Sequence, residues 1–221
     1  TDGITAADSS SDVIAAWMGI KIKVKNLTLS GGTSGIKILG GGIAVLESSK
    51  IENMSDHGAY SAGAVSICNN STIENIEKYG TFVLASSFGI IEKCQLTGNS
   101  ASDTVRFITG SGGQILDSTI TGGKSALLIE RASSALIGKS KAVTITGAET
   151  GITVHGGSNV EIMNTTINSN SGNGIYADLN SSVYLGGDNT ITNNGRYAVE
   201  LKTGSTLSNK CSNSNNISSN S

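Results

Sequence analysis

The chain of 221 residues has little net charge, no proline and no long hydrophobic run. Fifteen basic and seventeen acidic residues leave a net charge of −2, which provides no cationic surface of the kind that binds nucleic acid or an anionic membrane. No apolar run approaches the length of a transmembrane helix, so we expect no membrane insertion by this segment. No signal peptide is visible, and the sequence could start after a removed one.

Only three cysteines are present, and their spacing matches no metal or redox motif. We predict that Cys68 lies in a core column of a repeat and that Cys94 takes an inward position used by serines in neighbouring repeats. Because the two columns differ, no disulfide between Cys68 and Cys94 is expected, and both residues are predicted to be buried thiols. The acidic GGxGxD repeat of calcium-binding turns is absent. We therefore expect no metal and no cofactor.

What the sequence does contain is a repeat rich in glycine, asparagine and serine. The segment Gly151–Ser169 (GITVHGGSNVEIMNTTINS) consists of three short apolar pieces separated by polar turns, and the next segment repeats it. None of these pieces can bury a face alone, but units stacked head to tail would pair strand on strand in parallel. The repeats occur at intervals of 22 to 26 residues and begin near Ser34, Ala59, Thr81, Asp103, Ser125, Gly151, Gly174 and Tyr197.

One aliphatic position recurs in every repeat. In a stack of coils each such residue would be buried against the next, which contributes about 1.5–3 kcal/mol apiece. The turns that follow this position are rich in asparagine and glycine, which adopt left-handed backbone conformations at low cost. The aliphatic column comprises Leu29, Ile51, Ile73, Leu96, Ile120, Ile145, Ile167, Ile191 and Ile217.

The segments GSNVEIMNTTINSNSGNGI and LNSSVYLGGDNTITNNGRYAV resemble the repeat of the right-handed parallel β-helix, found in pectate-lyase-like enzymes, polysaccharide epimerases, phage tailspikes and bacterial surface passengers. The resemblance implies an all-β, single-stranded parallel β-helix of about eight to nine coils over residues 20–221. Residues 1–19 would form a cap or leader segment. Within it, residues 12–18 are predicted to form a short helix, with Trp17 plugging the open core.

Both ends of the predicted solenoid are irregular. The stretch Ile20–Leu29 alternates apolar and polar residues, which predicts a half-buried strand belonging to an incomplete first coil. From Asn209 onward the repeat continues with few apolar residues and without a capping helix, which predicts a fragment of a longer β-helical protein. Uncapped ends expose strand edges, so self-association, including a trimer, is an expected possibility.

Four acidic or titratable residues coincide when successive repeats are aligned without gaps: Glu130, His155, Asp178 and Glu200. Adjacent rungs of a parallel sheet lie about 4.8 Å apart, so an outward ladder is predicted. Glu130 and Asp178 would be roughly 9.5 Å apart, at the upper edge of the separation used by inverting glycosidases. If the protein is an enzyme, Glu130, His155 and Asp178 are the predicted catalytic residues. The leading interpretation of the ladder itself is a solvated strand edge, with a ligand contact as the next alternative; such a ladder could also take a divalent metal.

Further ligand-binding residues are predicted beside this ladder. Arg106 and Arg131 would either neutralise its carboxylates or contact a ligand, and Glu200 is assigned to binding. Tyr176, with Tyr184 and Tyr197, would form a line of aromatic faces suited to sugars. Cross-strand packing is the other interpretation of these tyrosines.

The motifs of known β-helix enzymes are absent. The nearest stretches are Asp56-His57, which lacks the proline of the Asp-Pro-His motif of alginate epimerases, and His155-Gly156. Our first interpretation is therefore an extracellular, secreted or cell-surface β-helical domain that mediates adhesion or glycan binding, with a glycan or a host-surface protein as its partner. The alternatives are a polysaccharide-active enzyme (glycoside hydrolase, lyase or epimerase) and a phage tailspike.

Overall fold

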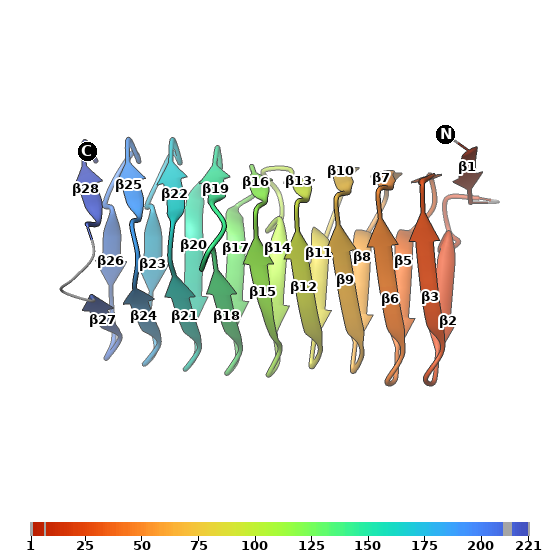
Figure 1. Cartoon of the computed structure of the whole chain (residues 1–221), viewed down its shortest axis with the longest axis horizontal. Coiled ribbons are helices and arrows are strands. Elements are labelled where there is room, and N and C mark those ends of the chain that lie inside the picture. Colours follow the sequence, from red (N-terminus) through yellow and green to blue (C-terminus); the bar gives the residue numbers. More distant parts are fainter. Residues whose placement is uncertain (1, 7, 210–213, 221) are drawn as a thin grey trace.

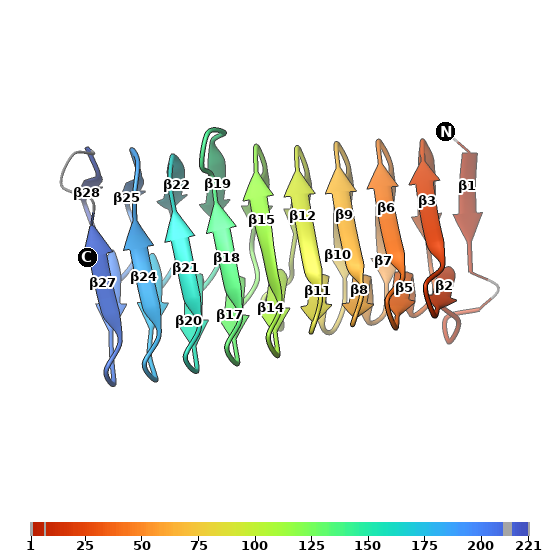
Figure 2. The ribbon, with the colours of Figure 1, turned by 60° about the horizontal axis from the view of Figure 1, so that its bottom comes forward.

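The computed structural model describes residues 2–6, 8–209 and 214–220, and within them the chain winds as a parallel β-solenoid of about nine turns (Figure 1). Each turn contributes one strand to each of three parallel sheets, and none of the described residues is helical. The successive turns lie side by side along the long axis, from the red N-terminal end to the blue C-terminal end (Figure 2). The predicted all-β parallel β-helix is confirmed.

Sheet A has ten strands, in the order β1 (Asp2–Thr5), β4 (Leu27–Ser30), β7 (Lys50–Met54), β10 (Thr72–Ile76), β13 (Gln95–Thr97), β16 (Thr119–Thr121), β19 (Val143–Thr146), β22 (Thr165–Asn168), β25 (Thr190–Thr192) and β28 (Asn216–Ser218). Sheet B has nine, in the order β2 (Ile14–Trp17), β5 (Ser34–Leu39), β8 (His57–Ala62), β11 (Gly80–Ala85), β14 (Val105–Ile108), β17 (Ser125–Glu130), β20 (Thr150–His155), β23 (Ile175–Ala177) and β26 (Val199–Leu201). Sheet C also has nine, in the order β3 (Lys21–Lys25), β6 (Ile43–Glu47), β9 (Val65–Asn69), β12 (Phe88–Glu92), β15 (Gly112–Leu116), β18 (Ser134–Ile137), β21 (Asn159–Ile162), β24 (Ser182–Leu185) and β27 (Thr206–Asn209).

The predicted aliphatic column runs through sheet A. Every pair of successive members lies in parallel register, from Leu29 opposite Ile51 to Ile191 opposite Ile217. The members are buried except the last, Ile217, which is 46% exposed at the end of the stack. This column, and its equivalents in the other sheets, form one continuous core along the solenoid.

Buried polar ladders hold the corners between the sheets. At the corner between sheets B and C, one backbone N–H in each of several successive turns donates to a serine hydroxyl of the next turn, as Ser111 does to Ser133 and Ser133 to Ser158. After sheet A, the backbone N–H of Asn170 donates in the same manner to the side-chain oxygen of Asn194. These ladders satisfy backbone groups that leave the strand pairing at each bend. The asparagine-rich turns therefore serve backbone geometry, as the sequence predicted.

The N-terminal segment differs from the prediction. Residues 12–18 form no helix; Ile14–Trp17 is the strand β2, because it pairs in parallel with β5. Trp17 is 54% exposed and does not plug the core. The stretch expected to be one strand bends at Asn26, where φ is +55°, and divides into β3 and β4. Hence β2, β3 and β4 complete a coil where an incomplete one was predicted.

The cysteines also differ from the prediction, because Cys68 and Cys94 form a disulfide with a Cα separation of 6.5 Å. The predicted columns are nevertheless right. Cys68 is buried opposite Ile91, and the backbone N–H of Cys94 donates to the hydroxyl of Ser118. The corner after β12 brings the two columns together across adjacent turns, which a strand-by-strand alignment does not reveal. Cys211 lies outside the described residues.

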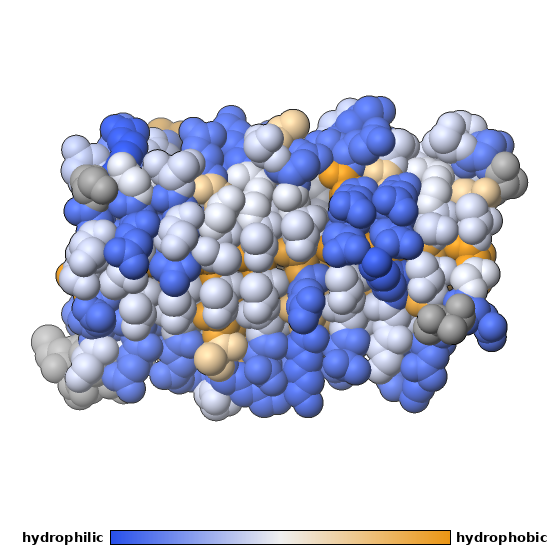
Figure 3. All heavy atoms as spheres, turned by 90° about the horizontal axis from the view of Figure 1, so that it is seen from above, coloured by the Kyte–Doolittle hydropathy of each residue, from blue (hydrophilic) through white to orange (hydrophobic). Residues whose placement is uncertain are grey.

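The surface seen from above, over sheet A, is hydrophilic or neutral, with hydrophobic atoms only in narrow strips (Figure 3). Among the described residues, no helix is long and apolar enough to cross a membrane.

Candidate functional site

The predicted ladder lies on the outer face of sheet B, where its strands end. Glu130 and His155 are the last residues of β17 and β20 and lie opposite each other in parallel register. Asp178 follows β23 directly, and the residue before it, Ala177, pairs with Val154. Because Val154 and Ala177 are buried and strand side chains alternate, the residues after them point outward. Sheet B thus places Glu130, His155 and Asp178 on successive rungs.

Glu200 is on the same sheet, but its predicted position in the ladder is wrong. Val199 pairs with Ile175, and Glu200 pairs with Tyr176. The gapless alignment was displaced by two residues, and the place next to Asp178 belongs to Lys202, which follows Leu201, the partner of Ala177. A shift of two residues preserves the alternation of inward and outward side chains, so the hydrophobic pattern could not detect it.

Three side chains on two rungs form a hydrogen-bonded group, which we call the His155 group: His155, Asp178 and Tyr176. The imidazole Nδ1 of His155 lies 2.5 Å from Oδ1 of Asp178. The phenol of Tyr176 donates to Oδ2 of Asp178 at 3.1 Å. An ionised Asp178 accepts both bonds, which assigns the neutral imidazole its proton on Nδ1 and leaves Nε2 as an acceptor. The side chain of His155 is 40% exposed, so a ligand can reach it.

Tyr176 keeps its proton in this arrangement. Burial raises the pKa of its phenol, and the hydrogen bond to Asp178 raises the pKa further. The ammonium of Lys202 lies 5.5 Å from the centre of the Tyr176 ring. The His155 group therefore contains a proton acceptor and a protonated phenol joined through one carboxylate. The contact between Tyr176 and Asp178 was not predicted, although the side chains of residues i and i+2 point to the same face of a strand.

Glu130, the third member of the ladder, is held by arginines. Its carboxylate lies 3.7 Å from Nη2 of Arg106 and 3.9 Å from Nε of Arg131. Arg106 also lies 3.7 Å from the carboxylate of Asp103, so it is bracketed by two acids. Arg131 is 68% exposed and stands at the corner after β17, where φ is +58°. Its guanidinium is thus the cation of this pair that remains open to a ligand.

A shallow hollow of about 360 Å³ adjoins the His155 group on sheet B, with Tyr176 in its lining. Its charged residues are of both signs, with Lys124, Arg196 and Lys202 opposing Asp103, Glu149 and Glu200. Glu200 accepts hydrogen bonds from Asn173 at 2.7 Å and from Lys202 at 3.1 Å, which lower the pKa of its carboxyl in that order of importance. Within the described residues, no group of three His, Cys, Asp or Glu side chains is arranged to hold a metal ion.

The three tyrosines do not form the predicted line. Tyr176 lies in sheet B, Tyr184 in sheet C, and Tyr197 precedes β26 with Arg196 5.7 Å from its ring centre. A three-sided solenoid turns residues eight positions apart onto different faces. Only Tyr176 belongs to the candidate site.

The dipeptide Asp56-His57 lies in the N-terminal half of sheet B. The His57 ring is packed 5.2 Å from Tyr79 and 4.9 Å from Tyr60, measured between ring centres. Burial lowers the pKa of His57 to about 4, so the ring is neutral at pH 7. The carboxylate of Asp56 contacts Lys78 at 3.2 Å. We interpret His57 as a packed structural residue, because none of the described carboxylates hydrogen-bonds its ring.

Three parallel sheets wound from one chain define a parallel β-helix protein. The chain belongs to the family described as "Right handed beta helix region", whose model matches residues 3–133 and 103–221. No curated protein matches the sequence.

Among solved structures, the fold is similar to a mutant of the periplasmic alginate epimerase AlgG, with a TM-score of 0.69 and 13% identity over 89% of this chain and 62% of that one. It is also similar to the A-module of mannuronan C-5 epimerase AlgE4 from Azotobacter vinelandii, with a TM-score of 0.64 and 15% identity over 99% of this chain and 77% of that one. The chain thus spans less than two thirds of the first epimerase. At these identities the similarity establishes the fold and leaves the reaction to the site residues.

Proposed function

We propose that this protein is a polysaccharide-active β-helix enzyme that removes a proton from a uronate sugar, as a lyase or a C-5 epimerase. The observation that carries the proposal is the His155 group, in which Asp178 binds Nδ1 of an imidazole whose side chain is 40% exposed. The two proteins of similar fold described above are epimerases of alginate and mannuronan, which supports the same class of substrate.

In the proposed reaction, Nε2 of His155 takes the proton from the ring carbon next to the substrate carboxylate. Asp178 stabilises the imidazolium that results. The electron pair left behind spreads onto the substrate carboxylate, so a nearby cation is needed. Arg131, which is 68% exposed, is the residue that we assign to this carboxylate.

The two outcomes differ in where the next proton goes. In epimerisation, the same carbon regains a proton on its opposite face, and the phenol of Tyr176 is the donor that we assign. In elimination, the bond from the neighbouring carbon to the glycosidic oxygen breaks, a ring double bond forms, and the leaving oxygen receives the proton. The raised pKa of Tyr176 keeps that proton available at neutral pH.

The adhesive surface or fibre domain and the tailspike receive no support from the comparisons. Glycan binding without turnover is therefore the result that would favour a binding role over an enzymatic one. We also propose a secreted or periplasmic location. The Cys68–Cys94 disulfide supports it, since disulfides persist in oxidising compartments.

The test is incubation with polymannuronate and polygalacturonate in deuterated water. Proton NMR would report deuterium at the epimerised carbon, and ultraviolet absorbance would report unsaturated products. We expect one of these signals in the wild type and its loss in His155→Ala, with Thr144→Ala, on sheet A, as the matched control. Uronate binding without either signal would contradict the enzymatic proposal.

A further inference from the structure

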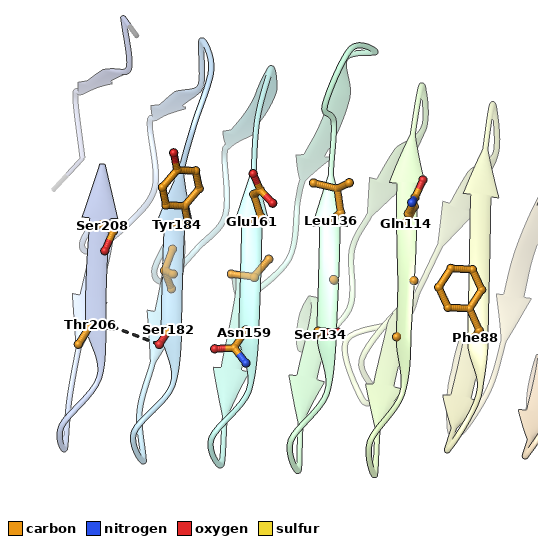
Figure 4. A pocket seen from close by; sticks show the side chains of 15 residues that line it. Phe88, Gln114, Ser134, Leu136, Asn159, Glu161, Ser182, Tyr184, Thr206 and Ser208 are labelled. Carbon is orange, nitrogen blue, oxygen red and sulfur yellow. Dashed lines mark hydrogen bonds between the residues drawn. The ribbon is translucent and has the colours of Figure 1, made fainter. Parts of the chain in front are cut away.

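A second hollow lies on sheet C, away from the His155 group. It has a volume of about 620 Å³ and crosses six consecutive strands, from β12 to β27 (Figure 4). We call it the sheet C groove. It runs along the solenoid axis, so its long direction crosses the strands and suits an extended ligand.

Two outward rows of side chains shape the sheet C groove. The first row is mostly small and forms the low side: Phe88, Gly112, Ser134, Asn159, Ser182 and Thr206. The second row forms the higher side, and its lining members are Gln114, Leu136, Glu161, Tyr184 and Ser208. The backbone does not require a glycine at position 112. A Cβ added there would meet only ordinary contacts, 3.6 Å from Ser134 and 3.7 Å from Phe88.

One aromatic ring lies at one end of the sheet C groove, and a second lies one strand from the other end. Phe88 in β12 is 43% exposed, and Tyr184 lies four rungs further along in β24. At ~4.8 Å per rung, their strands are separated by about 19 Å. Both rings turn a face toward the viewer, who looks into the groove (Figure 4). The Tyr184 ring lies against Gly186, where a Cβ would come within 2.7 Å of it, so the missing side chain lets the ring lie flat.

The polar part of the lining is almost uncharged. Amides of Gln114 and Asn159 and hydroxyls of Ser134 and Ser182 line the sheet C groove. Glu161 is its single charged residue, and the described residues offer it no ion-pair partner. Flat aromatic faces with amides and hydroxyls between them are the chemistry that recognises sugar rings. A lone carboxylate without a cation disfavours a polyanion.

We propose that the sheet C groove binds a linear, uncharged polysaccharide, with sugar rings stacked on Phe88 and Tyr184. This site is separate from the uronate site on sheet B and does not depend on catalysis there. It would anchor the protein to a neutral glycan that accompanies the uronate substrate.

The test is isothermal titration with cellohexaose, mannohexaose and xylohexaose, each with its disaccharide, and with a mannuronate hexamer. We expect at least one neutral hexamer to bind more tightly than its disaccharide and than the mannuronate hexamer, because only a chain of that length reaches both rings. Phe88→Ala and Tyr184→Ala should each weaken hexamer binding about five- to tenfold. Tyr197→Ala, which removes an exposed tyrosine outside the groove, is the matched control.

Ser134→Trp should block the groove and abolish binding while leaving the thermal unfolding transition in place. Failure of all three neutral hexamers to bind the folded wild type would overturn the proposal, as would equal losses in Tyr197→Ala and Tyr184→Ala. Self-association that Ser134→Trp removes, seen by sedimentation, would instead assign the face to a second copy of the chain. Measuring uronate turnover in the same preparations tests the sheet B site separately, so a failure of neutral-glycan binding on sheet C can be told apart from a failure of the enzymatic proposal.

Discussion

The two histidines of the chain stand on the same sheet but in different surroundings. His57, in the N-terminal half of sheet B, is packed between Tyr60 and Tyr79. His155, in the C-terminal half, is hydrogen-bonded to Asp178 and is 40% exposed. His57 begins β8 and His155 ends β20, so the two imidazoles stand at opposite ends of the same repeated strand. The position along the strand and the side chains around each ring therefore decide whether an imidazole is a packing group or a proton acceptor.

Substitutions of the two histidines should differ most in their effect on turnover. His155→Ala should lower the rate on a uronate polymer by about 10²–10⁴-fold, the usual contribution of a general base. His57→Phe should leave the rate within a few-fold, because the ring contacts only packing partners. The measurement is product formation at saturating polymer, with folding checked by circular dichroism. A larger loss in the His57 variant would reverse the assignment.

The next effect concerns the cross-link in the N-terminal half. Cys68→Ser together with Cys94→Ser removes the disulfide, which should lower the free energy of unfolding by about 2–4 kcal/mol. Hydrogen exchange should accelerate mainly in β9 and β12, and less in β20 and β23, where the His155 group lies. Equal acceleration along the whole chain would show that the halves unfold as one unit.

Acid should destabilise the protein through His57. Its pKa in the folded protein is about 4, against 6.5 for the free side chain. Its stabilising contribution is therefore complete above pH 6.5 and is lost as the pH falls through 4, since the unfolded chain takes up the proton first. The loss should approach roughly 2–3 kcal/mol. Urea unfolding at pH 7 and pH 4.5 would measure it, and His57→Phe should remove this part of the pH dependence.

The smallest expected effect comes from removing one of the two hydrogen bonds that the Asp178 carboxylate accepts from His155 and Tyr176. Tyr176→Phe removes one of its two hydrogen bonds and leaves the bond to His155. For an epimerase we expect a loss of about 10²-fold, the lower end of the usual contribution of a general acid, because the donor of the returning proton is gone. For a lyase whose leaving oxygen is protonated by water, the loss should be only a few-fold. Deuterium incorporation at the epimerised carbon, compared with the rate of unsaturated product, distinguishes the two.

Part of the site could be predicted because the repeat fixes which residues become neighbours. Glu130, His155 and Asp178 were placed on one face from spacing alone, and the register agrees. Glu200 was misplaced because a two-residue shift leaves the alternation intact. The strand at Ile14–Trp17 was missed because its short apolar run fits a helix as well as a strand, and only pairing with β5 selects the strand.

The sequence by itself determined the solenoid, since an aliphatic residue about every two dozen positions can be buried only by stacking turns in parallel. Which residues meet at the corners and across faces was decided by the tertiary structure. The disulfide and the bond from Tyr176 to Asp178 depend on how each corner bends and on side-chain direction. The sheet C groove depends on which outward residues are small on the successive strands from β15 to β27. The periodicity of the sequence determines which side chains point inward and which point outward. The distances between different columns of side chains are set only when each turn of the solenoid closes.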